Sequence, residues 1–256
     1  MMRRKYLVIM LIFTIVVGLS TIASAEEKAQ SDKWEFGAEV YLWGASIGGN
    51  TGTGSDLDIS FDDLLSNLEM AFMGAVGARK GKWSLMLDAI YLDVKGDDSF
   101  AIPVGRGLDI NGNGSVELTG WILTPSVGYN LLQKERIRLD VLAGARYLYL
   151  KSDAKFDFVT PTPIKKRDTV SDSIWDGIIG IKGHVNLNQN WYLPYYADIG
   201  TGSSNFTWQV FGGVGYRFKR LDLIAAYRYM DWNFDSGDAF DDLNLHGPFV
   251  GVKFRL

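Results

Sequence analysis

The sequence predicts an all-β fold: a transmembrane antiparallel up-and-down β-barrel of about ten strands. Three observations predict it. The chain begins with a segment typical of an export signal, it continues with segment after segment of alternating apolar and polar residues, and its last six residues, 251–256, alternate up to a terminal leucine. Together these features are typical of bacterial outer-membrane barrels, whose strands turn apolar residues to lipid and polar residues inward.

Residues 1–25 form the predicted signal peptide, with cleavage expected after Ala25. Basic residues lie at the start, an almost unbroken apolar stretch runs over 6–19, and Ala23 and Ala25 supply the small residues that signal peptidase needs. The apolar stretch, about 14 residues, is shorter than the roughly 20 that a membrane-spanning helix requires. The signal therefore predicts export and leaves no helical anchor in the mature chain.

The mature chain is expected to hold a short periplasmic segment, residues 26–32, and one barrel domain, residues 33–256. Three of the 26 basic residues lie in the signal, which leaves 23 against 30 acidic residues and a formal charge of −7. An acidic chain of this kind argues against nucleic acid as a partner. The absence of cysteine excludes lipidation, disulfides and thiolate metal sites.

Ten segments alternate as barrel strands should. In the first, 34–42, one parity is apolar and the other holds Glu35 and Glu39. The remaining segments are 69–79, 83–94, 116–131, 136–150, 173–187, 191–200, 206–218, 221–234 and 245–256. Eight strands are the alternative if two of these segments are misread.

Tight polar turns alternate with longer loops between these segments. The predicted turns are 80–82, 133–135, 188–190 and 219–220, and the predicted loops are 46–66, 95–115, 151–172 and 235–244. Short turns are typical of the periplasmic side of such barrels and long loops of the outside. With an even number of strands, both termini are expected in the periplasm.

Aromatic residues on the lipid-facing parity gather near both ends of the predicted strands. Those near the periplasmic ends are Trp34, Trp83, Tyr129, Trp191, Phe218 and Phe254, and those near the outer ends are Tyr91, Trp121, Tyr149, Trp175, Trp208 and Tyr229. Such residues form girdles at the two membrane interfaces. A soluble β-sandwich with an aromatic core is the alternative, but it would not explain the terminal strand.

The opposite parity predicts a lumen lined by charges of both signs. Its titratable members are Glu35, Glu39, Glu69, Arg79, Asp88, Arg138, Asp140, Arg146, Asp176, Lys182, His184, Asp198, Arg217, Asp222, Arg228 and Lys253. A ten-stranded barrel is narrow, so these side chains are expected to pair across the lumen and to leave little continuous water. The set is either a network that stiffens the barrel or part of a gated conduit.

No metal or cofactor site is predicted. Residues 109–114 match the first half of a calcium loop, but Gly120 stands where the bidentate glutamate belongs, so a glycine-rich hairpin is expected. The two histidines, His184 and His246, show no metal-ligand spacing.

Enzymatic activity is not expected either. Acidic residues and a histidine at the outer rim are of the type that the ten-stranded omptin proteases use: Asp231, Asp235, Asp238, Asp241, Asp242 and His246. The omptin catalytic motifs are not recognisable, however, and no serine and histidine pair in the manner of the outer-membrane lipid A deacylases.

The predicted loops differ in charge. The third loop holds basic residues that are suited to lipopolysaccharide phosphates, although ordinary solvated loop charge is the alternative: Lys151, Lys155, Lys165, Lys166 and Arg167. In the first loop, Phe61, Leu64 and Leu65 stand beside aspartates and predict a short amphipathic turn, folded over the mouth.

Several motifs resemble known outer-membrane sequences. The terminal Gly251-x-x-Phe254-x-Leu256 is similar to the signal that the outer-membrane assembly machinery reads. Five stretches resemble a widespread group of small proteobacterial outer-membrane β-barrel proteins of undefined activity: Trp34-Glu35-Phe36 with Tyr41-Leu42-Trp43, Phe61-Asp62-Asp63-Leu64-Leu65, Tyr227-Arg228-Tyr229, and Gly247-Pro248-Phe249-Val250-Gly251. The resemblance spans nearly the whole mature chain and implies no catalytic residue.

We therefore expect a monomeric Gram-negative cell-envelope protein, integral to the outer membrane, with an envelope-structural or surface-binding role. Its expected partners are outer-membrane lipid, lipopolysaccharide and the assembly machinery. A narrow, porin-like channel for small solutes is the main alternative, and an outer-membrane protease or lipid-modifying enzyme is a further one.

Overall fold

The computed structural model of the chain describes residues 33–51, 56–105, 108–159, 164–234 and 240–255. The predicted signal peptide and residues 26–32 lie outside this range. The strands are β1 (Glu35–Trp43), β2 (Ser46–Thr51), β3 (Asp56–Ile59), β4 (Leu68–Lys80), β5 (Trp83–Gly105), β6 (Leu108–Gln133), β7 (Ile137–Val159), β8 (Ile164–Asn186), β9 (Trp191–Gly202), β10 (Phe206–Arg217), β11 (Leu221–Asn233) and β12 (Phe240–Arg255). One short helix, α2 (Phe61–Ser66), precedes β4. Within the described ranges, no helix has the length and apolar character needed to cross a membrane.

Ten of these strands close into an antiparallel barrel. From β4 to β12 each strand pairs with the next in the chain, and β1 closes the ring by pairing with both β4 and β12. Strand β2 pairs with the first part of β12, and β3 pairs with β2, so this hairpin adds to the rim without entering the ring. The predicted fold class and the count of ten strands are confirmed.

Four short connections meet at one end of the barrel, called the turn end below. They link β4 to β5, β6 to β7, β8 to β9 and β10 to β11, where the four turns are predicted. The described chain also starts and finishes at this end, because Glu35 lies opposite Arg79 of β4 and the Arg255 backbone N–H donates to the Arg220 carbonyl. The opposite end is called the far end.

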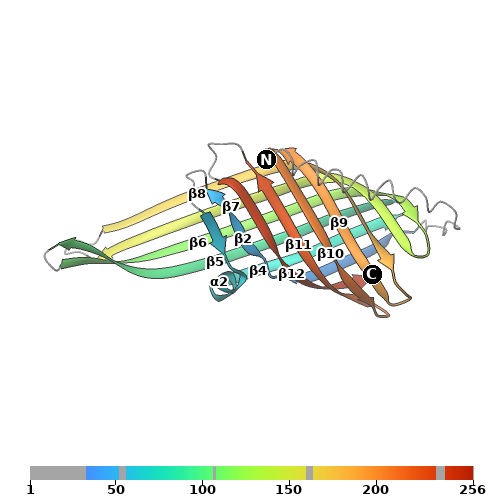
Figure 1. Cartoon of the computed structure of the whole chain (residues 1–256), viewed down its shortest axis with the longest axis horizontal. Coiled ribbons are helices and arrows are strands. Elements are labelled where there is room, and N and C mark those ends of the chain that lie inside the picture. Colours follow the sequence, from blue (N-terminus) through green and yellow to red (C-terminus); the bar gives the residue numbers. More distant parts are fainter. Residues whose placement is uncertain (1–32, 52–55, 106–107, 160–163, 235–239, 256) are drawn as a thin grey trace.

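Four strands project beyond the far end of the barrel wall. Strands β5 to β8 have 23 to 26 residues each, whereas β9 to β11 have 12 or 13. Pairing between β4 and β5 stops at Leu68 with Val94, and pairing between β8 and β9 stops at Asp176 with Gly202. Past these points β5 to β8 pair only with one another, and Figure 1 shows them reaching well past their neighbours. We call the described parts of residues 95–118 and 151–175 the projection.

The predicted loops 95–115 and 151–172 are therefore wrong over most of their length. The expected hairpins are present, but their tips are only the connections around residues 106–107 and 160–163. Segment 95–115 is rich in glycine and segment 151–172 is rich in charged and hydroxyl-bearing residues, a composition typical of loops, although short stretches such as 153–158 alternate. Backbone pairing continues outward from the barrel wall and needs no apolar periodicity.

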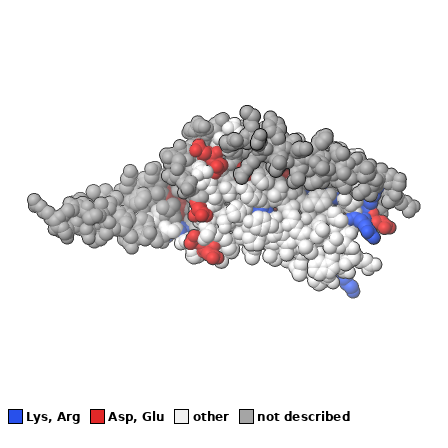
Figure 2. Space-filling view, viewed as in Figure 1, with Lys and Arg blue, Asp and Glu red and all other residues white. Residues whose placement is uncertain are grey.

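The outward face of the barrel is apolar. Exposed side chains on it include Phe36, Val76, Leu85, Ile179 and Val250, each more than half exposed. Aromatic pairs flank this belt, such as Trp83 with Tyr129 near the turn end and Trp208 with Tyr229 near the far end, with ring centroids 5.0 and 4.8 Å apart. In Figure 2 an uncharged surface separates acidic residues on the far-end side from charged residues of both signs at the turn end. The positions match the two predicted girdles.

The barrel wall is interrupted between β1 and β4. Their pairing stops at Val40 with Gly74, although β1 continues to Trp43 and β4 to Leu68 at the far end. Helix α2 connects the two sides of this interruption, since it follows β3 and leads into β4.

Helix α2 is the predicted amphipathic turn of the first loop. It begins after Ser60, whose Oγ accepts a hydrogen bond of 3.2 Å from the Asp63 backbone N–H, as an N-cap should. Leu64 is buried in the apolar cluster of the lumen, whereas Leu65 is 54% exposed. The helix therefore packs at the far end with one apolar side chain in the buried cluster.

Candidate functional site in the barrel lumen

Inward-facing charges form a buried network across the middle of the barrel. The Arg146 side chain is fully buried, and its Nη2 lies 2.5 Å from Oδ2 of Asp198, two strands away on β9. The same guanidinium donates to Thr207 Oγ1 at 2.8 Å and to Gln209 Oε1 at 3.2 Å, both on β10. The Arg146 guanidinium is therefore in direct hydrogen-bond contact with one carboxylate and two neutral acceptors.

Gln209 links this pair to a second one. Its Oε1 also accepts from Arg228 Nη2 at 3.2 Å, and Arg228 Nη2 lies 3.1 Å from Asp88 Oδ1. Tyr41 donates to Asp88 Oδ2 at 2.9 Å and accepts from Arg228 Nη1 at 3.1 Å. The chain of contacts runs from β9 through β7, β10 and β11 to β5 and β1, so it crosses the lumen from wall to wall. We call it the middle network.

Above the middle network, towards the far end, the lumen is apolar. The Arg228 guanidinium lies 4.9 Å from the centre of the Trp43 ring, and Arg146 lies 5.6 Å from that of Trp232. The buried members of the apolar cluster, of which Tyr192 and Ile224 lie nearer the turn end than the middle network, are Tyr41, Trp43, Ala45, Ile47, Leu64, Ile90, Ile122, Leu148, Tyr192, Ile224, Met230, Trp232, Leu243 and Phe249. The contacts of these two guanidinium groups with the two indole rings thus connect the middle network to the apolar cluster.

The sequence reading missed this apolar half of the lumen. It treated the inward parity as polar throughout, yet Ile90 follows Asp88, and Met230 and Trp232 follow Arg228, at the same two-residue spacing. That continuation of parity was the available signal. In β5 and β11 the charged part of the inward row is followed, towards the far end, by apolar side chains.

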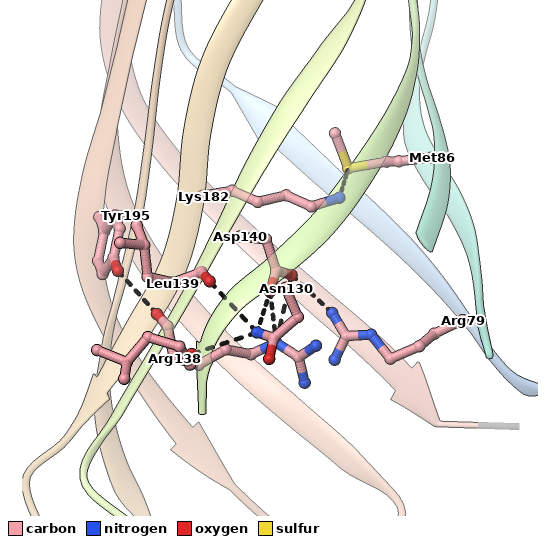
Figure 3. Close-up of polar contacts among 9 residues, drawn as sticks. Arg79, Met86, Asn130, Arg138, Leu139, Asp140, Lys182 and Tyr195 are labelled. Atoms are coloured by element: carbon pink, nitrogen blue, oxygen red, sulfur yellow. Dashed lines mark hydrogen bonds and ion pairs between the residues drawn. The ribbon is translucent and has the colours of Figure 1, made fainter. Parts of the chain in front are cut away.

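A second cluster lies near the turn end, around Asp140. Arg79 Nη2 lies 2.8 Å from Asp140 Oδ2, and Arg138 Nε lies 3.1 Å from Oδ1. Asn130 Nδ2 donates to the same Oδ1 at 2.5 Å. Figure 3 shows these three donors converging on one carboxylate, with the Lys182 amine directed to the thioether of Met86. We call Arg79, Asn130, Arg138 and Asp140 the turn-end network.

The other predicted lumen residues occupy separate positions. Asp222 accepts from Tyr192 OH at 3.1 Å and faces Arg255 at 3.1 Å. Arg217 donates to Asn186 at 2.7 Å, and its guanidinium stacks over the ring of Tyr192 at 4.3 Å.

Six further members of the predicted set lie apart from both networks. Asp176 accepts from the Ser204 backbone N–H at 2.8 Å at the far end, and His184 packs edge-on against Tyr192. Glu39 lies opposite Lys253 in the pairing of β1 with β12. Glu35 and Glu69 are exposed and take no part in the two networks.

The predicted rim cluster does not converge on one point. His246 lies on the outward face, where its Nδ1 is 3.0 Å from Tyr227 OH and its ring stacks on Tyr229. Asp242 instead accepts from Asn50, at 3.0 and 3.2 Å. Asp235 and Asp238 lie outside the described residues, and among the residues that are described no three metal-ligating side chains come together.

The basic residues predicted for a loop lie in paired strands. Lys151 of β7 forms an ion pair of 2.5 Å with Asp153 of the same strand. The register of β7 with β8 puts Lys155 opposite Arg167, and it puts Lys165 and Lys166 on the next positions towards the tip. The backbone thus gathers four basic residues on one hairpin of the projection.

Comparison with known proteins gives structural neighbours only. No protein-family model matches the chain, and no curated protein matches it. The chain is similar to the translocator domain of the autotransporter NalP from Neisseria meningitidis, with 17% identity, 96% of this chain and 95% of that chain covered, and a TM-score of 0.44. It is also similar to Ail, the attachment invasion locus protein of Yersinia pestis (11% identity, 88% and 99% covered, TM-score 0.35), and to the P. putida toluene transporter TodX (11%, 90% and 90%, TM-score 0.32). The barrel fold itself rests on the strand pairing above.

Proposed function

We propose that the protein is an integral β-barrel of a bacterial outer membrane with an envelope-structural or surface-binding role, in which the projection is the binding surface. In the proposed orientation the turn end and both termini face the periplasm, and the projection faces the outside. One observation carries the proposal: the protein combines a lumen crossed by buried ion pairs with a four-stranded sheet that extends past its wall.

The outward face supports the membrane location. A tilted strand of about 9–11 residues spans a bilayer, and β9 and β10 have 12 residues each. Their exposed apolar side chains, between two sets of aromatic residues, match a hydrocarbon core with its two interfaces. A soluble protein would not expose so many large apolar residues over its whole circumference.

The length of the projection supports a role at the surface. At about 3.3 Å per residue, the 11 to 14 residues by which β5 to β8 exceed β9 and β10 correspond to roughly 35–45 Å of strand. Nothing in a stiffening or conducting role requires that extension. Its β7–β8 hairpin gathers Lys155, Lys165, Lys166 and Arg167, and guanidinium and ammonium groups suit phosphate oxygens. Lipopolysaccharide phosphates are therefore the proposed partner.

Binding to vesicles tests the surface role. Protein refolded in detergent is mixed with vesicles that contain or lack lipopolysaccharide, and co-flotation is measured. We expect retention by lipopolysaccharide to fall when Lys165, Lys166 and Arg167 are all changed to glutamine. The matched control changes Lys219 and Arg220 to glutamine, at the turn end. If vesicles with lipopolysaccharide retain both variants equally, the projection is not the binding surface.

A narrow channel is the second candidate, because several polar atoms of the middle network have no hydrogen-bond partner among the described residues. They include Arg146 Nε, Asp198 Oδ1 and Arg228 Nε, and internal water is the usual partner of such atoms. Planar-bilayer recordings separate the two candidates. A closed barrel gives no discrete steps, whereas steps that change when Arg146 or Arg228 is neutralised favour the channel. We propose no catalytic role.

A further inference from the structure

The Lys182 amine turns away from the carboxylate that lies opposite it. In the pairing of β7 with β8, Lys182 faces Asp140 directly, yet Asp140 accepts from Arg79, Arg138 and Asn130 instead. The Lys182 side chain crosses the inner wall to β5, where Nζ lies 3.9 Å from the sulfur of Met86 (Figure 3). A thioether is a weak acceptor, so the ammonium has no strong partner among the described side chains.

Positive charge exceeds negative charge around Asp140. Three cationic side chains, those of Arg79, Arg138 and Lys182, share this one carboxylate, and Asp140 and Arg138 are largely buried. Arg138 Nη2 is also buried without a hydrogen-bond partner among the described residues. An unpaired cation in a largely enclosed lumen is costly, and a bound anion removes that cost.

Unused hydroxyl donors lie on the wall that Lys182 crosses. Ser84 and Ser126 are more than nine-tenths buried, and the Oγ atoms of both have no hydrogen-bond partner in the described structure. Ser126 lies opposite Met86 in the pairing of β5 with β6, and Ser84 lies opposite Gly128. Hydroxyl groups donate to anions as readily as to water.

Ser84 and Lys182 both approach Gly128 closely. A Cβ atom built on Gly128 would lie 2.6 Å from Ser84 Oγ and 3.4 Å from Lys182 Cε. The Ser84 hydroxyl and the lysine stem therefore border the same space beside Gly128, and a side chain at position 128 would clash with the hydroxyl. The donors around it are single N–H and O–H groups, and the Met86 thioether forms an apolar side.

We propose that this space is a binding site for a small monovalent inorganic anion, of which chloride is the simplest. The Lys182 ammonium supplies the charge, and the hydroxyls of Ser84 and Ser126 complete the set of donors. A single ammonium with two hydroxyls fits a small spherical anion better than a tetrahedral one, which would need more donors. The site does not depend on the role of the projection or on whether the lumen conducts.

The first test locates the anion. Crystals of the refolded protein are grown in sodium bromide, and anomalous scattering is measured at the bromine edge. A peak in contact with Lys182 Nζ supports the site. Density for water alone beside Lys182, with no anomalous peak, would overturn it.

The second test measures binding through stability. Thermal unfolding of the refolded protein is followed at constant ionic strength while chloride replaces gluconate, which is too large for the space. Because an anion that binds only the folded state stabilises it, we expect the midpoint to rise by about 3–6 °C at a chloride concentration of about ten times Kd. Lys182→Met and Gly128→Ala should abolish the rise, and the Ser84→Ala, Ser126→Ala double variant should reduce it.

The control is Lys253→Met, which removes a different inward lysine, one that is exposed. This variant should keep the full chloride effect. For each variant, the unfolding midpoint in chloride is compared with the midpoint in gluconate. A change in the variant's overall stability shifts both midpoints and does not affect their difference. An equal chloride effect in the parent protein and in Lys182→Met would refute the site.

Discussion

Removing one partner of the Arg146–Asp198 pair should strongly destabilise the barrel. Both side chains are fully buried, and their charged atoms are 2.5 Å apart. In Asp198→Ala, the guanidinium keeps Thr207 and Gln209 as acceptors but loses its only ion-pair carboxylate among the described residues. A buried charge left in this way costs about 3–5 kcal/mol, far more than a salt bridge at the surface.

Two companion variants test the reasoning. Arg255→Ala removes an ion pair with Asp222 in which the arginine side chain is 46% exposed, and it should cost less than about 1 kcal/mol. The double variant Arg146→Met, Asp198→Leu removes both buried charges, so it should cost less than Asp198→Ala alone.

The assay is reversible urea unfolding of the refolded protein in lipid vesicles, followed by tryptophan fluorescence. The free energy of unfolding is compared among the four proteins at equal lipid concentration. If Asp198→Ala and Arg255→Ala lower the free energy of unfolding equally, the Arg146–Asp198 pair is not isolated from water. The conclusion that the lumen is closed would then be wrong. If the double variant is the least stable, the pair stabilises the fold beyond the cost of burying its charges.

Other parts of the structure give further predictions. Leu64→Ala should cost about 2–3 kcal/mol and should speed proteolysis within α2, whereas Leu65→Ala, at an exposed position, should change neither; equal effects would mean that Leu64 does not anchor the helix to the barrel. Trp232→Ala empties part of the apolar cluster and should allow ion conductance in a planar bilayer if that cluster closes the far end. If the variant does not conduct, the middle network closes the lumen. Replacing residues 97–115 and 155–167 by two-residue turns should leave a folded, heat-modifiable barrel, because pairing of the ring stops before those segments; failure to fold would show that the projection stabilises the wall.

Much of the fold could be predicted from the sequence, because lipid imposes a strict pattern. Segment 34–42 alternates since one face meets hydrocarbon, and β1 occupies nearly the same residues. The pattern fails where that constraint ends. Residues 95–105 of β5 pair with β6, although Gly96, Pro103 and Gly105 give this segment the composition of a loop.

The candidate site could be predicted only in part. Parity indicates that Arg146, Asp198 and Arg228 all point inward, but it does not indicate which of them meet. That depends on the stagger of the strands around the ring, a property of the closed barrel. The apolar cluster around Trp232 was open to prediction from parity alone, and the assumption of a polar lumen concealed it.

The pairing of β1 with β12 also constrains how the protein acquires its structure. Neighbouring strands from β4 to β12 are close in sequence, so their hairpins can form early and locally. The ring, however, closes only when residues near the start of the chain meet residues near its end, which carries the largest loop-closure entropy in the molecule. Until then β1 and β12 both present unpaired edges that invite association with other chains. Folding should therefore be slow and should end with closure, and the incomplete barrel should be the species most prone to aggregate.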